Sequence, residues 1–492
     1  MRQKIKKITA ILLCCLTLTT VLPMVASAEG FLYNFDEADG GPHCKSLLMV
    51  NLETSKVVYA MNPDEQLPMA SLTKIMAYIV ASENIPDIHN TVITVTEEVK
   101  TELEGTGSSL AGVTVGEEFT AYQLLHLMMI PSGNDAALTL EKYVDTLDIK
   151  LSSKQPEVTP TSENEETDED SPENPDPEAA NDLSGDKSLS FIDLMNLKAK
   201  ELGCENTKFT NSHGLHDEDH YTTARDMVKI VEFAMALPDF TKITQTPMYI
   251  LEPTNTNPQP REIFSTNRML SAVHEEYYKY STGIKTGSHN EAGYCIAASA
   301  VRDGYSYVVI ALGAPRIDEN GNTLDFHGEM WDTRELFQWA FQNLKLKTIA
   351  ENGQLLGSVE LKYAWKKDNL QVVASENVST ILPDTVETSS IIPILELPDS
   401  IEAPVKKGDV IGKATLTYAD EVIGSVSLVA AETVEKSEML ITLEQGKAVF
   451  TSHWFLIVIA AIGFLVLLYI VLLIYSRKKK RKLKKVRRYR DM

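Results

Sequence analysis

The segment Ser71-Leu-Thr-Lys74 places a hydroxyl and an amine at a spacing that suits nucleophilic catalysis. It opens the apolar stretch 71–82, which has the composition of a buried helix. Residues three apart share one face of a helix, so the lysine can take the serine proton if burial or a nearby cation lowers its pKa. The pattern is weak alone, because an N-cap serine beside a solvated lysine looks the same, and S-x-x-K recurs at 184–187 and 476–479.

A second candidate group is Ser132-Gly-Asn134, which follows the apolar stretch 121–129. A turn after a helix can present a hydroxyl and an amide into a cleft. The serine could relay a proton to a leaving amine, and the asparagine could hold a substrate amide. S-x-N recurs elsewhere in the chain, for example at 82–84, 162–164, 265–267 and 375–377, so an ordinary turn or helix cap explains it equally well.

The third group, Lys285-Thr286-Gly287, occurs once and precedes a predicted strand at 294–301. A lysine and a threonine side by side at a strand end can bind a carboxylate by charge and by a hydroxyl hydrogen bond. The glycine lets a ligand approach the backbone closely. An exposed turn at a strand edge is the structural alternative.

Periodicity predicts the elements that must position these groups. A hairpin is expected over 46–59, and two antiparallel strands over 294–301 and 305–312 flank the turn Arg302-Asp-Gly304. Together with helices they predict a mixed α+β domain over 29–346. The helices are predicted at 71–82, 121–129, 135–144, 192–202, 224–236 and 331–344.

The pattern of apolar and polar residues changes after residue 346. Short alternating stretches separated by Gly, Asp and Lys turns predict a small all-β domain over 347–436. Its strands are expected at 359–363, 370–374, 391–397, 413–418 and 422–429.

Residues 152–188 form a low-complexity stretch inside the first domain. They contain twelve acidic residues, two lysines, five prolines and no aromatic residue. Such a composition cannot bury enough apolar surface to order itself. We predict a disordered acidic insertion that loops out between two helices.

The N-terminus, residues 1–28, has the pattern of a secretory signal peptide. Four basic residues precede a short apolar stretch, and Ala26-Ser-Ala28 is a small-residue cleavage signature. The alternative, a permanent membrane anchor, is disfavoured because the apolar stretch is short. The mature chain is then expected to be extracytoplasmic.

The C-terminus predicts a membrane span. After a linker at 437–453, residues 454–475 form a run of 22 without charge, long enough for a bilayer core of about 30 Å. The tail 476–492 has eleven basic residues, and a basic cluster next to a span marks the cytoplasmic side. A nucleic-acid-binding tail is the alternative. The predicted protein is a single-pass cell-membrane protein with an extracytoplasmic body and a cytoplasmic C-terminus.

Charge and cysteine content exclude other classes. Residues 29–475 have 31 basic and 68 acidic residues, a net charge of about −37, so the body should not bind nucleic acid by neutralising phosphates. Cys44, Cys204 and Cys295 allow at most one disulfide and are expected to be buried small hydrophobic residues. The ten histidines show no zinc-ligand spacing, so no metal site is predicted.

Together and in this order, the three motifs resemble those of penicillin-recognising serine enzymes. Their surroundings narrow the resemblance to low-molecular-mass D-alanyl-D-alanine carboxypeptidases, peptidase family S11, over about 40–435. The segments that carry it are 67–74 (LPMASLTK), 128–137 (MMIPSGNDAA), 211–215 (NSHGL), 283–287 (GIKTG) with 291–295 (EAGYC), 403–412 (APVKKGDVIG) and 424–430 (GSVSLVA). The resemblance implies a serine transpeptidase/β-lactamase-like catalytic domain before the β domain. The acidic insertion and the full membrane span depart from the family pattern.

The resemblance also implies catalytic roles. Ser71 would attack the carbonyl between the last two D-alanines of a peptidoglycan stem peptide and form an acyl-enzyme. Lys74 would be the general base. Ser132 would pass the proton to the departing D-alanine, and Asn134 would orient the peptide.

The third motif would bind the substrate. Lys285 and Thr286 would hold its terminal carboxylate, beside Gly287. Backbone N–H groups of Ser71 and Ser288 would form the oxyanion hole. No metal or organic cofactor is implied. β-Lactams would acylate Ser71 as mimics of D-Ala–D-Ala.

Three other functions use similar residues. A class A β-lactamase would carry an E-x-x-L-N segment, and the sequence has none. A non-catalytic membrane receptor on the same fold would be expected to have a broken motif, whereas all three are intact. An endopeptidase or transpeptidase would use the same residues, so the motifs do not separate it from a carboxypeptidase.

Overall fold

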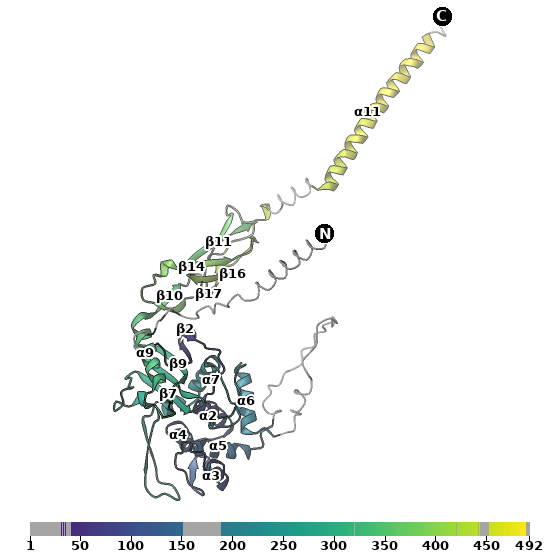
Figure 1. The fold of residues 1–492 in the computed structure, drawn as a ribbon. Coiled ribbons are helices and arrows are strands. Elements are labelled where there is room, and N and C mark those ends of the chain that lie inside the picture. The colour runs from purple at the N-terminus through teal and green to yellow at the C-terminus, as the bar shows by residue number, and fades with distance from the viewer. Residues whose placement is uncertain are drawn as a thin grey trace, which may run out of the picture. The chain divides into compact units, whose positions relative to one another are not determined.

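The structure is a computed structural model (Figure 1). It describes residues 31, 33, 35, 41–150, 188–318, 320–419, 421–440, 442 and 452–488. The predicted signal peptide, nearly all of the predicted acidic insertion and most of the predicted linker lie outside the described residues. The chain forms two compact units, Met1–Leu344 and Lys345–Met492.

The first unit mixes helices and strands, which confirms the predicted α+β class. Its helices are η2 (Ala70–Leu72), α2 (Thr73–Asn84), α3 (Glu97–Leu103), α4 (Ala121–Met129), α5 (Asn134–Asp145), α6 (Phe191–Glu201), α7 (Ala224–Ala236), α8 (Phe240–Thr244), η5 (Arg268–Leu270) and α9 (Gly328–Asn343). Its strands are β1 (Ser46–Asn51), β2 (Lys56–Met61), β3 (Val92–Thr94), β4 (Glu118–Thr120), β5 (Met248–Leu251), β6 (Arg261–Phe264), β7 (Ser281–His289), β8 (Gly293–Arg302) and β9 (Tyr305–Ala314).

A five-stranded antiparallel sheet organises this unit, with strand order β2-β1-β9-β8-β7. Helix α7 packs against β1 and β9, and α9 packs against β8 and β9. All six residues of β1 are buried, so alternate side chains on both faces of this strand are covered. The hairpin at 46–59 and the strands at 294–301 and 305–312 are therefore confirmed, and the nearly continuous burial of β1, β8 and β9 explains why those three strands are apolar runs.

Helix α2 is the centre of the core and packs against α4, α5, α6 and α7. Every residue from Thr73 to Ala81 is buried. The six predicted helices are all present, with ends displaced by at most three residues. Ser71 lies in the short 3-10 turn η2, immediately before α2.

The Lys285-Thr286-Gly287 motif lies inside a strand, so its predicted place at a strand end is wrong. It occupies the middle of β7, the edge strand of the sheet, and Lys285 pairs with Ala297 of β8. Glycine and small polar residues have low strand propensity. Pairing with the apolar strand β8 is what makes this segment extended.

The three cysteines that the structure describes are free thiols. Cys44, Cys204 and Cys295 are each buried, as predicted for small apolar residues. Burial raises the pKa of all three thiols, with that of Cys204 and Cys295 at about 12. They are therefore protonated and unreactive.

The second unit contains an all-β domain and a long helix. A six-stranded sheet has the order β14-β16-β17-β12-β11-β15, and β10 pairs with β13. All five predicted strands are present, whereas β10, β13 and β15 had not been predicted. The elements are β10 (Leu344–Ala350), β11 (Leu355–Lys362), β12 (Asn369–Ala374), β13 (Val378–Pro383), η6 (Thr388–Ser390), β14 (Ile392–Glu396), β15 (Ser400–Glu402), β16 (Val410–Tyr418), β17 (Glu421–Ala430) and α11 (His453–Arg488).

Helix α11 contains a stretch that is long and apolar enough to cross a membrane. The stretch is His453–Lys478, and its apolar side chains are exposed. It includes the predicted span 454–475.

Candidate active site

The Ser71 hydroxyl lies next to the amine of Lys74. Lys74 Nζ is 3.0 Å from Ser71 Oγ, across one turn at the start of α2. The amine also donates to Asn134 Oδ1 at 2.7 Å and to the main-chain oxygen of His213 at 2.6 Å. A neutral lysine that donates two hydrogen bonds keeps one lone pair. The lone pair of Lys74 Nζ therefore points to the serine hydroxyl, as a general base requires.

The surroundings of Lys74 favour its neutral form. The side chain is fully buried, and burial is the main cause that lowers its pKa well below the usual value. The nearby charge of Lys285 lowers it further, while Asp135 opposes the change. The sequence could place this lysine beside the serine, but not predict its burial.

The turn between α4 and α5 supplies Ser132 and Asn134. Ser132 is buried and has φ = 63°, a left-handed backbone that turns the chain sharply between the two helices. Asn134 is the first residue of α5, and its side chain reaches Lys74. The structure thus joins Asn134 to the Ser71–Lys74 pair, although sixty residues separate it from Lys74.

Strand β7 forms another wall of the site. Lys285 is buried and donates to the main-chain oxygen of Thr286 at 2.8 Å. Burial lowers the pKa of Lys285 to about 7. The hydroxyl of Thr286 lies 2.6 Å from that of Thr266, in the loop after β6.

Gly287 allows β7 to approach Ser71 closely. A Cβ at this position would lie 2.7 Å from Ser71 N and 3.1 Å from Met69 O. Both neighbours are backbone atoms, so any side chain here would displace η2 or β7. The glycine of this motif therefore sets the distance between β7 and Ser71.

A cavity of about 150 Å³ lies between these elements. Ser71, Ser132, Thr286, Gly287 and Ser288 line it. Lys74, Asn134 and Lys285 are buried and are not among the lining residues. Tyr294, from the segment 291–295, also lines the cavity. Sequence reasoning missed the remaining lining residues, which stand in no recognisable motif: Ser109, Thr266, His327, Glu329 and Met330.

The segment 211–215 contributes a backbone atom that sequence reasoning missed. The main-chain oxygen of His213 meets Lys74, and Asn211 Oδ1 accepts from Gly214 N–H at 2.6 Å. Gly214 has φ = 89°, and a Cβ there would come within 2.1 Å of the oxygen of Ala70. Burial and Lys74 lower the pKa of the His213 ring to about 3, so the ring is neutral.

Asp135 fixes the loop that carries Ser109. Its carboxylate accepts the backbone N–H groups of Ala111, Gly112 and Val113 at 2.8, 2.9 and 3.1 Å. The backbone N–H of Asn134, the residue before Asp135, donates a hydrogen bond to the main-chain oxygen of Ser109 at 2.8 Å. The start of α5 therefore holds two walls of the cavity together.

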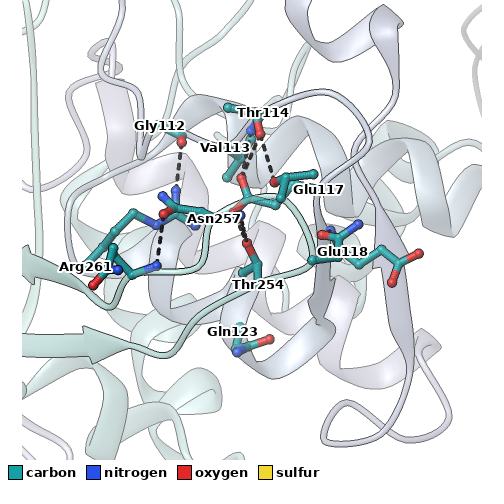
Figure 2. Close-up of polar contacts among 12 residues, drawn as sticks. Gly112, Val113, Thr114, Glu117, Glu118, Gln123, Thr254, Asn257 and Arg261 are labelled. Atoms are coloured by element: carbon teal, nitrogen blue, oxygen red, sulfur yellow. Dashed lines mark hydrogen bonds and ion pairs between the residues drawn. The ribbon is translucent and has the colours of Figure 1, made fainter.

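A buried ion pair supports the same loop from behind (Figure 2). Glu117 is fully buried and accepts from Arg261 Nη2 and Thr254 Oγ1, each at 2.5 Å, and from Thr114. Arg261 also donates to the oxygen of Gly112 at 3.0 Å. The pair ties β6 to the loop that Asp135 holds, and no sequence motif indicated it.

Comparison with known proteins agrees with the motif pattern. Residues 36–145 and 179–316 match the family model described as D-alanyl-D-alanine carboxypeptidase. Residues 344–436 match the model described as penicillin-binding protein 5, C-terminal domain.

Individual relatives align over most of the chain. D-alanyl-D-alanine carboxypeptidase DacF from Bacillus subtilis is 26% identical over 404 residues, 82% of this chain and 88% of that protein. A D-alanyl-D-alanine endopeptidase from Pseudomonas aeruginosa is 26% identical over 252 residues, 51% of this chain and 65% of that protein. The structure of penicillin binding protein 5 from Haemophilus influenzae has a TM-score of 0.56 at 22% identity, over 80% of this chain and 98% of that one, which shows a shared fold.

Proposed function

The chain belongs to the D-alanyl-D-alanine carboxypeptidase family and is a serine-type enzyme of that family; from this premise we propose that it shortens peptidoglycan stem pentapeptides by their terminal D-alanine through an acyl-enzyme on Ser71. The observation that carries the mechanism is the 3.0 Å contact between Ser71 Oγ and the buried Lys74 amine. Serine is a poor nucleophile unless a base removes its proton, and this lysine is placed to do so.

Acylation follows from the contacts of Lys74. The neutral amine takes the Ser71 proton while Asn134 and the His213 carbonyl hold its N–H groups. Oγ attacks the carbonyl carbon between the two D-alanines, and the N–H groups of Ser71 and Ser288 stabilise the oxyanion. The C–N bond then breaks, and the proton reaches the leaving D-alanine amine through the Ser132 hydroxyl.

Deacylation uses the same groups in reverse. A water molecule gives its proton to Lys74, attacks the ester carbonyl and releases the shortened peptide. Ser71 regains its proton from the lysine. Every step is a proton transfer or an acyl transfer among residues that line the cavity or lie behind its wall.

The carboxylate of the substrate selects the scissile bond. We assign its binding to the Thr286 hydroxyl and to the positive charge of Lys285, which is buried in the middle of β7. Asn134 orients the peptide through its amide. A β-lactam with a carboxylate in the same place would acylate Ser71 and block the enzyme.

We assign to the second unit the role of holding the enzyme at the membrane. We propose that His453–Lys478 anchors the chain in the cell membrane, since its charge-free run of 22 residues, 454–475, is long enough to span a bilayer. The basic residues after it favour a cytoplasmic C-terminus. The active site then faces the cell wall, where the stem peptides are.

The decisive test is D-alanine release from a blocked L-Lys-D-Ala-D-Ala peptide by the full-length chain in detergent. We expect Ser71→Ala to lose at least about 10³-fold in rate. Ser476→Ala is a matched control, because Ser476 stands in an S-x-x-K pattern of the same spacing outside the first unit. Intact-mass measurement after penicillin treatment should show one adduct, absent in Ser71→Ala.

The endopeptidase alternative makes a different prediction. A folded parent that cleaves cross-linked dimers of stem peptides but releases no D-alanine from the pentapeptide would move the assignment to endopeptidase. A parent that does neither and takes up no penicillin would refute the acyl-enzyme mechanism.

A further inference from the structure

Two histidines and a glutamate meet beside the cavity. Each of His216, His289 and Glu291 offers a ligand atom, and these atoms all lie within 4.8 Å of one another. His289 ends β7, Glu291 lies in the turn between β7 and β8, and His216 follows the loop that bonds Lys74. More than seventy residues separate His216 from the other two, so no ligand spacing was visible in the sequence.

The geometry resembles that of a tetrahedral metal site. His289 Nδ1 lies 3.0 Å from Glu291 Oε2, and the ring centroids of His216 and His289 are 5.3 Å apart. Zinc–nitrogen bonds of about 2.0–2.1 Å place two ligand atoms about 3.3 Å apart and two imidazole centroids about 5 Å apart. The ligand atoms are at most 4.8 Å apart, so the exposed His216 side chain has to move closer for all three groups to bind one ion.

Neighbouring contacts hold the turn in place without the ion. Ala292 N–H lies 3.1 Å from His289 Nδ1, and Arg316 donates to Asn290 Oδ1. A single ring nitrogen cannot satisfy both the Ala292 N–H and the Glu291 carboxylate, because one contact needs an acceptor and the other a donor.

Charge and access also suit a cation. His216 and Glu291 are exposed, so an ion can reach them from solvent. The acidic run Asp217-Glu218-Asp219 follows His216 directly, and its negative charge offsets the positive charge of Arg316.

We propose that His216, His289 and Glu291 bind one divalent transition-metal ion of the Zn²⁺ class, with a fourth position open to water. Two imidazoles and one carboxylate are a zinc donor set, and they favour Zn²⁺ over Mg²⁺ or Ca²⁺. The ion links β7 to the 211–216 loop. The first carries the carboxylate-binding motif, and the second holds the Lys74 amine, so the ion restrains two sides of the cavity. This inference rests on the geometry alone and not on the proposed reaction.

The test uses the full-length chain in detergent, stripped with a chelator and titrated with Co²⁺ and then with Zn²⁺. Tetrahedral Co²⁺ gives strong visible absorption, and Zn²⁺ should displace it at one ion per chain. We expect His216→Ala and His289→Ala each to weaken binding by about 10–100-fold or more and Glu291→Gln to weaken it less. His274→Ala, an exposed histidine outside the cluster, is the matched control.

Thermal unfolding gives a second readout. Zn²⁺ should raise the melting temperature of the parent and of His274→Ala but not that of His216→Ala, whose own melting temperature without metal should match the parent's. Absence of tetrahedral Co²⁺ absorption in the parent would overturn the proposal. So would equal Co²⁺ binding by the parent and by the His216→Ala/His289→Ala double variant. None of these outcomes depends on whether the chain releases D-alanine.

Discussion

The pH dependence of the reaction tests the assigned role of Lys285 most directly. Burial lowers the pKa of this lysine to about 7, whereas the terminal carboxylate of the substrate stays negative across the neutral and alkaline range. Only the protonated lysine attracts the carboxylate. We therefore expect kcat/KM for a D-Ala-D-Ala peptide to fall as pH rises through about 7.

The size of the fall follows from the fraction of protonated lysine. Two pH units above its pKa, about 1% of Lys285 carries a proton, so kcat/KM at pH 9 should be about 100-fold below its maximum. That ratio corresponds to about 2.7 kcal/mol. Lys74 acts in the opposite direction, because a general base must be neutral, so its contribution to the rate rises with pH.

The assay is D-alanine release by the full-length chain between pH 5.5 and 9.5, at substrate concentrations well below KM. Lys285→Arg keeps its charge throughout this range, so its falling limb should be absent whatever its absolute rate. With the parent enzyme, a substrate whose terminal carboxylate is replaced by an amide should show a much smaller fall in kcat/KM as pH rises. A parent profile that stays flat or rises from pH 7 to 9 would refute the carboxylate-binding role.

Three further predictions test other parts of the structure. Gly287→Ala should lower the rate of acylation by penicillin about 100-fold, because the added methyl group meets Ser71 N; a normal rate would show that β7 can move away. Arg261→Met should lower the free energy of unfolding in urea by about 3–5 kcal/mol, because it leaves Glu117 buried and unpaired. Adding Glu117→Gln should recover part of this loss, and a loss below about 1 kcal/mol in the single variant would contradict a buried ion pair. Deletion of 453–492 should move the protein from the membrane to the soluble fraction, and retention in the membrane would contradict the assigned anchor.

Local patterns predicted much of the fold. The helices at 121–129 and 224–236 have the predicted bounds, because apolar periodicity and turn residues act over a few positions. The strands at 294–301 and 305–312 were visible for the same reason. Segments with little apolar content, such as α3 and β7, were missed or misplaced because tertiary packing determines their conformation.

Burial accounts for most of what could not be predicted about the site. The sequence identifies residue 74 as a lysine, but the lowered pKa of this lysine depends on the helices packed around α2. The Glu117–Arg261 pair and the cavity residue Glu329 belong to no motif, and the segment 211–215 gave no sign that the His213 carbonyl would meet Lys74. Their contacts join segments far apart in the chain.

Three separations along the sequence show the difference between what local spacing predicts and what the tertiary structure decides. Ser71 and Lys74 are three residues apart, so helix geometry alone places them on one face, and their chemistry could be predicted from local spacing. Asn134 lies sixty residues beyond Lys74 and Gly287 more than two hundred beyond Ser71, yet each lies against its partner. Local interactions cannot encode such contacts. They arise because α2, α5 and β7 bury their apolar faces in one core, which brings the three motifs to one cavity and excludes the water that would otherwise keep both lysines charged.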